Sequence, residues 1–241
     1  ESQDSKGNQK SAAPRHVWLW ELALEEEACA RVRQLWDEAS DGRALQPIPS
    51  PHVTLLYIGG GTDQEIAARH AGFGGDNEVA KFRSDLESKA GMEVAFEVTS
   101  VVWDNRVAAA EVSGLQTLSA NAHPHITLAT APKVPPVVSN ELLARRAAAV
   151  DLETGLWQWL KELSLEQYQE PLRSWCLAMG AASPDEISEN AADAAAAMEP
   201  ENADERSRIQ ALLERCKPGE LSSVKLDPPI IVTGRVHAQR R

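Results

Sequence analysis

Two short motifs of the form His-x-Thr hold the side chains best suited to chemistry in this chain, His52-Val53-Thr54 and His125-Ile126-Thr127. Each follows a proline and opens a hydrophobic run that is typical of a β-strand. Because side chains alternate between the faces of a strand, the His and the Thr of each motif share one face, and the apolar residue between them points to the other. Two such strands side by side would present two imidazoles and two hydroxyls to one cleft, an arrangement suited to acid/base chemistry on a phosphate.

The pairing of the motifs is what makes them informative. Six His and eight Thr in 241 residues would give roughly 0.2 His-x-Thr occurrences by chance, yet two are present and both are followed by Leu. A single copy would be explained equally well by a surface strand with ordinary polar residues. Two copies in matching strand contexts predict a shared site.

The segments around the motifs predict the elements that must hold them in place. Strands are expected at 15–24, 51–60, 93–102, 106–113 and 124–130, and helices at 25–39 and 77–90. Strands and helices in this order predict an α+β fold.

The paired motifs resemble the 2H phosphoesterase superfamily, whose signature is two H-x-[ST] strands lining one groove. More narrowly, HITLATAPKVPPVVSNELL (125–143) resembles the cyclic phosphodiesterase domain of fungal-type tRNA ligases, in which a His-x-Thr strand is followed by a Pro and a Ser-Asn-x-Leu-Leu segment. Residues 101–113 and 228–238 resemble two further strand regions of that domain. The resemblance covers about 15–150 and 217–238.

This resemblance implies both a fold and a reaction. The fold is a bilobal sheet-and-helix core, in which each lobe contributes one motif strand to a shared groove. The reaction is hydrolysis of a 2′,3′-cyclic phosphate at an RNA end or in a nucleotide, without metal or cofactor, to a 2′-phosphate. His52 and His125 are carried over as the acid/base pair, and Thr54 and Thr127 as hydroxyls that bind the phosphate. Which histidine is the base stays open, as do the natural substrate and the position of the product phosphate.

Residues near the motifs carry weaker expectations. Tyr57 lies three positions beyond the first Thr, hence on the opposite strand face, and is expected to pack in the core unless the strand bulges. His123 forms His-x-His with the second motif, but no carboxylate or Cys cluster accompanies it, so a loop histidine is favoured over a metal ligand. Ser139 is expected to be a helix N-cap. Arg106 is expected to be a charge at a hairpin tip, with a phosphate contact as the alternative.

Residues 151–216 break the pattern and predict an all-helical unit. Segments LWQWLKELSLEQY (156–168), MGAASPDEI (179–187) and R-x-x-I-Q-x-L-L (206–213) resemble a SAM (sterile alpha motif) domain, which implies protein binding or self-association. An ordinary helical insertion is the alternative. The predicted organisation is a disordered lead-in (1–14), a catalytic core (15–150 with 217–241) and a helical insertion (151–216).

Bulk composition narrows the function and the compartment. The net charge of −12 argues against a broad basic groove for nucleic acid, but it permits action on an RNA 3′ terminus or a small nucleotide. Three cysteines without C-x-x-C spacing indicate a reducing compartment, cytoplasmic or nuclear. No apolar run is long enough to span a bilayer, so no membrane partner is expected. Because the first residue is Glu1 rather than Met, an excised piece of a longer polypeptide is expected.

Two alternatives to a cyclic phosphodiesterase stay open. In one, the SAM-like unit is a scaffold for protein partners and the 2H core is vestigial, although intact His and Thr at all four positions weigh against decay. In the other, the fold is kept and the enzyme trims RNA ends or hydrolyses another cyclic or bridged phosphate. The kinase and ligase domains of a complete tRNA ligase are absent from these 241 residues, so a part in tRNA splicing is not assigned.

Overall fold

The computed structural model describes residues 16–40, 44–70, 72–215 and 221–240. The expected disordered lead-in at 1–14 and Cys216 lie outside these ranges. None of the helices in the described ranges is both long and apolar enough to cross a membrane.

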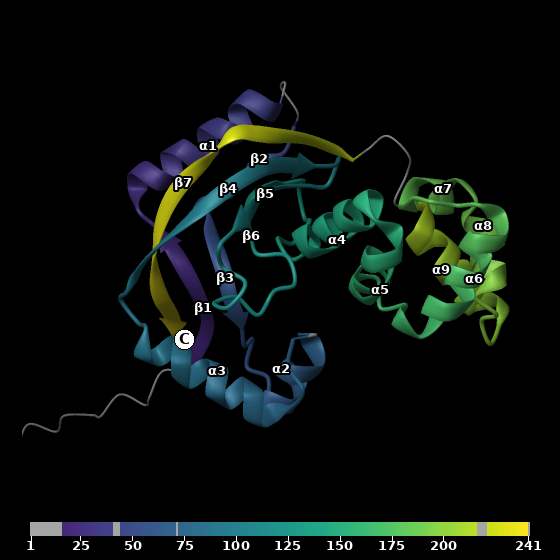
Figure 1. Ribbon diagram of the computed structural model, residues 1–241, viewed down its shortest axis with the longest axis horizontal. Helices are drawn as coiled ribbons and strands as arrows, with labels where there is room; N and C mark the ends of the chain where they lie inside the picture. Colours follow the sequence, from purple (N-terminus) through teal and green to yellow (C-terminus); the bar gives the residue numbers. More distant parts are fainter. Residues whose placement is uncertain (1–15, 41–43, 71, 216–220, 241) are drawn as a thin grey trace, which may run out of the picture.

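The described strands form one closed antiparallel sheet (Figure 1). They are β1 (Val17–Leu24), β2 (Gln46–Pro47), β3 (His52–Tyr57), β4 (Glu93–Trp103), β5 (Val107–Ser113), β6 (His125–Thr130) and β7 (Ser222–Arg240). Their order is β2-β6-β3-β1-β7-β4-β5, and β5 also pairs with β6, which closes the sheet into a barrel. The mixed α+β class is confirmed. The motif strands β3 and β6 are neighbours in this one sheet rather than members of two lobes, because the β5–β6 pairing leaves no gap at which the sheet could divide.

Strand β7 ties distant parts of the chain together. It pairs with β1 over Val17–Leu24 and with β4 over Glu93–Trp103. The sequence indicated this strand only at 228–238. Few of its side chains are buried, so its first residues lack the apolar alternation that marks a strand.

The burial of β3 decides which way its motif faces. Val53 and Leu55 are fully buried, and they belong to the same apolar cluster as Val32 and Trp36 of helix α1 (Glu26–Ser40). Burying side chains of this size contributes about 1.5–3 kcal/mol each, so the strand is held strongly in this orientation. The His and the Thr of the motif are therefore turned to the opposite face of the sheet.

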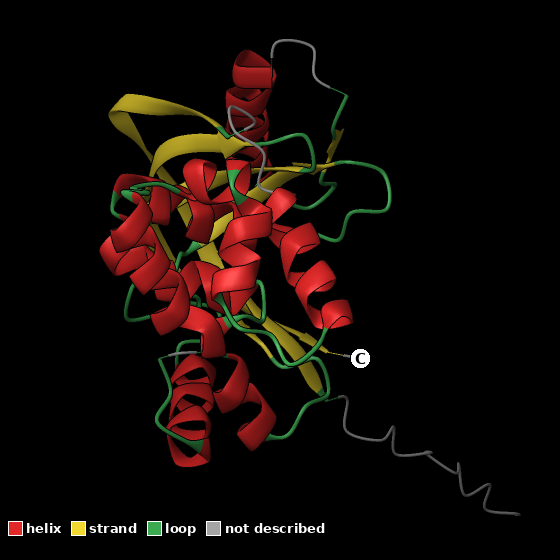
Figure 2. Cartoon of the chain, turned by 90° about the vertical axis from the view of Figure 1, so that its right-hand side faces the viewer, coloured by secondary structure: helices red, strands yellow, loops and turns green. Residues whose placement is uncertain are grey.

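Helices occupy two places in the chain. After β3 come α2 (Asp63–Arg69) and α3 (Asp76–Ser88). Between β6 and β7 come α4 (Val138–Val150), α5 (Leu152–Glu162), a short 3-10 turn (Glu166–Tyr168), α6 (Gln169–Met179), α7 (Pro184–Glu189), α8 (Ala191–Ala197) and α9 (Ala203–Glu214). Figure 1 shows α6–α9 grouped on the far side of α4 and α5 from the sheet, and in Figure 2 helices lie in front of the strands.

The helices between β6 and β7 have an apolar cluster of their own. Trp159, Leu172 and Ile209 are fully buried in it, and Ala144 and Ala148 of α4 pack against the same cluster. Helix α4 therefore contacts the sheet on one side and the other helices on the other. The division into a catalytic core and a SAM-like insertion stays a prediction.

Candidate active site

The two motif strands meet at one residue pair. Val53 of β3 lies opposite Ile126 of β6, and both side chains are fully buried. Because the strands are antiparallel, this register places the His of each motif beside the Thr of the other, with the two histidines on a diagonal. The structure thus brings all four predicted residues to one face of the sheet.

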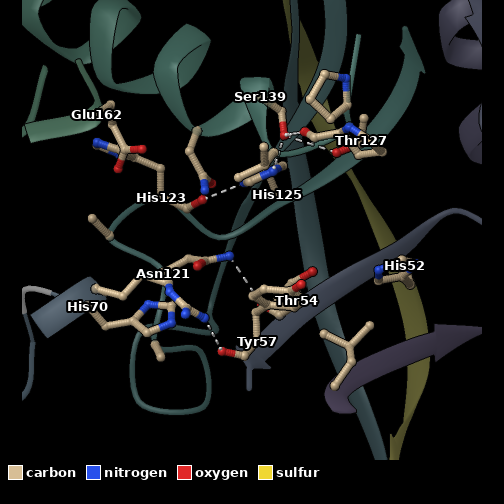
Figure 3. Close-up of a pocket in the computed structure, with 18 of the residues that line it drawn as sticks. His52, Thr54, Tyr57, His70, Asn121, His123, His125, Thr127, Ser139 and Glu162 are labelled. Carbon is tan, nitrogen blue, oxygen red and sulfur yellow. Dashed lines mark hydrogen bonds between the residues drawn. The ribbon is translucent and has the colours of Figure 1, made fainter. Parts of the chain in front are cut away.

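A single cavity of about 540 Å³ is lined by both motifs. Its other walls are the end of α2, the loop at 120–123, the start of α4 and two residues of α5. Figure 3 shows Thr127, His125 and Ser139 together on one side of this space, with Thr54 and Tyr57 along β3 on the other. Helices and loops thus close a pocket over the face of the sheet that carries the motifs.

His125 is buried and held at both ring nitrogens. Its Nδ1 lies 2.7 Å from the carbonyl oxygen of His123, and its Nε2 lies 2.6 Å from Ser139 Oγ. A carbonyl oxygen only accepts, so Nδ1 carries the proton. Burial above all, and to a smaller extent the neighbouring imidazoles of His123 and His52, lowers the pKa of His125 to about 4, although the hydrogen bond to the His123 carbonyl opposes the shift. At neutral pH the imidazole is therefore uncharged, and the lone pair of Nε2 accepts a hydrogen bond from Ser139 Oγ.

Ser139 is a component of the site that the sequence pattern did not reveal. It was expected to cap α4, but the helix begins one residue earlier, at Val138, and the N-cap position makes no side-chain hydrogen bond. The fully buried Ser139 Oγ instead lies 3.0 Å from Thr127 Oγ1 and 2.6 Å from the Pro136 carbonyl oxygen. The resemblance of its Ser-Asn-x-Leu-Leu segment to the family was a signal for this residue, but the sequence alone did not indicate a contact with the second motif.

His52 has a different environment. Its side chain is 30% exposed, and its Nδ1 lies 3.0 Å from the Ser50 carbonyl oxygen and 3.6 Å from Glu21 Oε2. Glu21 itself is buried, accepts a hydrogen bond of 2.9 Å from Gln239 Nε2 and lies 3.2 Å from His237 Nδ1. When His52 is protonated, its contact with Glu21 becomes an ion pair. Glu21 stands in an acidic stretch of sequence, and only the register of β1 against β3 and β7 singles it out.

Tyr57 lines the cavity, contrary to the expectation that it packs in the core. The β1–β3 register shifts between Trp20 and Glu21, whose partners are Leu56 and Thr54. This irregularity leaves Leu55 as an extra residue on β3, so the alternation of faces is reset beyond it. The strand bulges, which is the condition under which Tyr57 was expected to turn toward the site.

Two further residues singled out in the sequence, Arg106 and His123, have a structural partner or a position at the cavity wall. Arg106 contacts Asp104 at 2.8 Å and Glu141 at 2.9 Å, so it links the β4–β5 turn to α4 and does not line the cavity. His123 lines the cavity and contributes its carbonyl to His125. Within the described ranges no group of His, Cys, Asp and Glu is arranged to hold a metal ion.

Helix α5 supplies an acidic side chain to the cavity. Gln158 and Glu162 both line it, and Gln158 Nε2 donates to Glu162 Oε1 at 2.8 Å. Burial raises the pKa of Glu162 above its ordinary value. A carboxyl group at this wall is therefore more easily protonated than one in water.

Comparison with known proteins gives one match that covers most of the site. Residues 20–166 match the family model of the fungal tRNA ligase phosphodiesterase domain, a span that contains both motifs, Ser139 and helix α5. No curated protein matches significantly. A solved structure entitled "Crystal Structure of Fungal RNA Kinase" is 16% identical with a TM-score of 0.41, over 57% of this chain and 37% of that one. This chain thus spans well under half of that structure's length, and the likeness is too low to carry an argument. Because the matched family model spans more than half of the residues, the chain belongs to the fungal tRNA ligase phosphodiesterase domain family.

Proposed function

We propose that this protein hydrolyses 2′,3′-cyclic phosphates at RNA ends or in nucleotides, with His52 and His125 as an acid/base pair. The observation that carries the proposal is the diagonal placement of two imidazoles and two threonine hydroxyls on neighbouring strands of one cavity. Membership of a phosphodiesterase family of RNA-processing enzymes supports the same reaction class.

The different environments of the two histidines support a different role for each. His125 is the base, because burial keeps it neutral and its Nδ1–H is committed to a carbonyl, which leaves the lone pair at Nε2. His52 is the acid, because Glu21 lies close enough to form an ion pair with its imidazolium form. As the water oxygen bonds to phosphorus, water gives a proton to Ser139 Oγ, and Ser139 passes its own proton to His125 Nε2. The bond from phosphorus to the ribose 3′ oxygen breaks, and that oxygen takes the proton of His52, which leaves a 2′-phosphate.

The threonines stabilise the charge that develops on the phosphate. Thr54 and Thr127 would each donate a hydrogen bond to a non-bridging oxygen, where negative charge grows in the transition state. In the structure the Thr127 hydroxyl lies at Ser139 Oγ instead. A phosphate oxygen bound near Ser139 Oγ would accept the same hydrogen bond from Thr127.

Ser139 can follow His125 through both of its protonation states. Its single proton is donated to Nε2 while His125 is neutral. Once His125 has taken a proton, Nε2–H donates to Ser139 Oγ and the serine proton turns to the Pro136 carbonyl. The second acceptor is already within 2.6 Å, so the change needs only rotation of one hydroxyl.

Hydrolysis of adenosine 2′,3′-cyclic phosphate in the presence of EDTA tests the proposal. Wild-type turnover should survive the chelator, and His52→Ala or His125→Ala should each lower kcat by about 100-fold or more. His16→Ala is the matched control, because His16 is exposed and lies outside the cavity. Phosphorus NMR of the product should show a 2′-phosphate.

Two outcomes would overturn the proposal. One is a wild-type protein with no turnover on the nucleotide or on an RNA with a cyclic phosphate end. The other is a double variant of both histidines that is as active as the wild type. The first would leave the scaffold alternative, in which the helices between β6 and β7 are the functional part. The second would mean that other side chains carry out the hydrolysis.

A further inference from the structure

A guanidinium group faces the same cavity at a distance from the histidines. Arg69 is the last residue of α2, and its Nη1 donates to the Tyr57 carbonyl oxygen at 3.3 Å. Its Cζ also lies 5.3 Å from the centre of the Tyr57 ring, a cation–π contact. Two contacts to one strand residue thus fix the position of this charge at the wall of the pocket.

The Tyr57 ring is itself held in place. Trp18 meets it edge-on, with ring centres 6.0 Å apart. On the following turn, a Cβ built on Gly59 would lie 2.7 Å from Tyr57 Cε1, and Gly59 has a φ of +61°. Glycine is required here for both reasons. The turn after β3 therefore leaves space for the Tyr57 ring, and the Arg69 guanidinium packs over this ring.

No described carboxylate forms an ion pair with Arg69, although Glu65, one turn earlier on α2, interacts with its charge through space. Arg83, by contrast, pairs with Asp63 at 2.7 Å. Glu65 is engaged by Thr62, whose backbone N and Oγ1 lie 2.7 and 3.0 Å from Glu65 Oε2. A fixed guanidinium that no carboxylate contacts directly can still donate its hydrogen bonds to an anion.

The cavity offers an anion no other strong attraction besides the histidines. Among the lining residues, all of which the structure describes, Arg69 is the one Lys or Arg and Glu162 the one acid. Burial and then the charge of Arg69 lower the pKa of the neighbouring His70, which keeps it neutral. With a net charge of −12, the protein as a whole repels polyanions, so a phosphate would be held locally by this residue.

The separation along β3 between the motif at Thr54 and the Arg69 contact at Tyr57 is on the scale of one nucleotide. Thr54 and Tyr57 lie three residues apart on β3, less than about 10 Å of strand because Leu55 between them is bulged, and both side chains line the same cavity. A ribonucleotide whose cyclic phosphate lies between the histidines carries its 5′-phosphate at the other end of the ribose. A nucleoside 2′,3′-cyclic phosphate has no such group.

We propose that Arg69 binds the 5′-phosphate of the nucleotide that bears the cyclic phosphate, and thereby selects phosphodiester-linked RNA ends over free nucleoside cyclic phosphates. This inference rests on the proposed function. The role of a basic residue at the end of a helix, to stabilise the helix dipole, also applies to Arg69, but it predicts no effect of a 5′-phosphate on turnover.

The test compares two substrates that differ only at the 5′ position, adenosine 2′,3′-cyclic phosphate and its 5′-phosphorylated form. For the wild type, kcat/KM should be about 10-fold to 100-fold higher for the 5′-phosphorylated substrate, mainly through KM. Arg69→Ala should bring this ratio to about one. Arg69→Gln, which keeps a donor for the Tyr57 carbonyl and loses the charge, should do the same. Arg69→Lys should keep part of the ratio, because the charge remains without the planar fork.

Arg83→Ala is the matched control, because it removes an equal charge from the neighbouring helix, where Arg83 pairs with Asp63 away from the cavity. It should leave the wild-type ratio intact. Equal kcat/KM on both substrates in the wild type would overturn the inference while the proposed function stands. A preference that persists in both Arg69→Ala and Arg69→Gln would also overturn it. Turnover of neither substrate by the wild type would overturn the proposed function, and the inference with it.

Discussion

His125 lies buried between a backbone carbonyl and a serine hydroxyl, whereas His52 is partly exposed beside the carboxylate of Glu21. In the sequence the two motifs are nearly interchangeable. The difference between them comes from residues outside the motifs, Ser139 on α4 and Glu21 on β1. The proposed base has to stay neutral and the proposed acid has to be charged, which calls for opposite surroundings, and the two histidines differ in this respect.

Burial of His125 predicts that the protein loses stability on mild acidification. Its pKa is lowered from 6.5 to about 4 in the folded protein, so between these pH values the unfolded chain binds more protons. The stabilisation is fully present above pH 6.5 and is lost as the pH falls toward 4, by about 3 kcal/mol in total. Urea unfolding at a series of pH values from 7.5 to 4.5 measures this slope.

The variant His125→Gln should flatten that slope, because the side chain no longer titrates. Its control, His16→Gln, changes an exposed histidine and should keep the wild-type slope. Identical slopes in His125→Gln and the wild type would show that the acid sensitivity has another source. The pKa values of the buried His70 and the partly buried His123 are shifted in the same direction and would account for any slope that remains in the variant.

At the scale of elements, α4 and α5 pack so closely at Ala148 and Gly155 that no space is left for a side chain on Gly155. A Cβ on Gly155 would lie 2.5 Å from Ala148 Cα and 2.6 Å from its backbone nitrogen. The close crossing sets the position of α5, and with it Gln158 and Glu162 at the cavity. A glycine in a helix interior is otherwise unfavourable, so its presence here is explained by the packing.

Gly155→Ala is therefore expected to destabilise the protein by about 1–3 kcal/mol, since the added methyl group forces the helices apart. Without a clash the same change would stabilise a helix by up to about 1 kcal/mol, so the sign of the effect identifies the cause. Thermal unfolding measures it, and KM for the cyclic phosphate should rise as α5 moves away. Gly72→Ala, where no atom lies within 4 Å of the new group, is the control and should change neither quantity much.

The elements that the sequence predicted well are those with a strong periodic pattern. The stripe of Val32, Leu35 and Trp36 marked α1, and apolar alternation marked β1 and the motif strands. The bulge at Leu55 could not be predicted, because three apolar residues in a row fit either face of a strand. The partners of Arg106 and Ser139 could not be predicted either, since each lies on another element and only the tertiary fold brings them together.

At the scale of the whole molecule, the order of the strands in the closed sheet could not be predicted from the sequence. Adjacent strands such as β4 and β5 follow from a short turn, but β7 pairs with strands that precede it by more than a hundred residues. The acidic composition, by contrast, was informative in itself. It indicated that any contact with RNA is local, which agrees with a cavity in which one arginine is the only non-histidine cation among the described lining residues.

The pairing of β6 has a consequence for motion. One edge of this strand is shared between β3, at Ile126, and β2, at Ala129 and Thr130, so the two motif strands are joined along a short stretch. By comparison β4 and β7 pair along Glu93–Trp103. Backbone amides in short, irregular pairings open to solvent more often. Hydrogen–deuterium exchange should therefore be faster in peptides that contain 52–57 and 125–130 than in one that contains 93–103.

Uniform protection across these peptides would contradict this picture. If the exchange pattern holds, a nucleotide that engages both histidines would act as a cross-link between β3 and β6, and its binding should slow exchange at those strands before any other. The substrate would then link β3 and β6 at the place where few backbone pairs join these two strands.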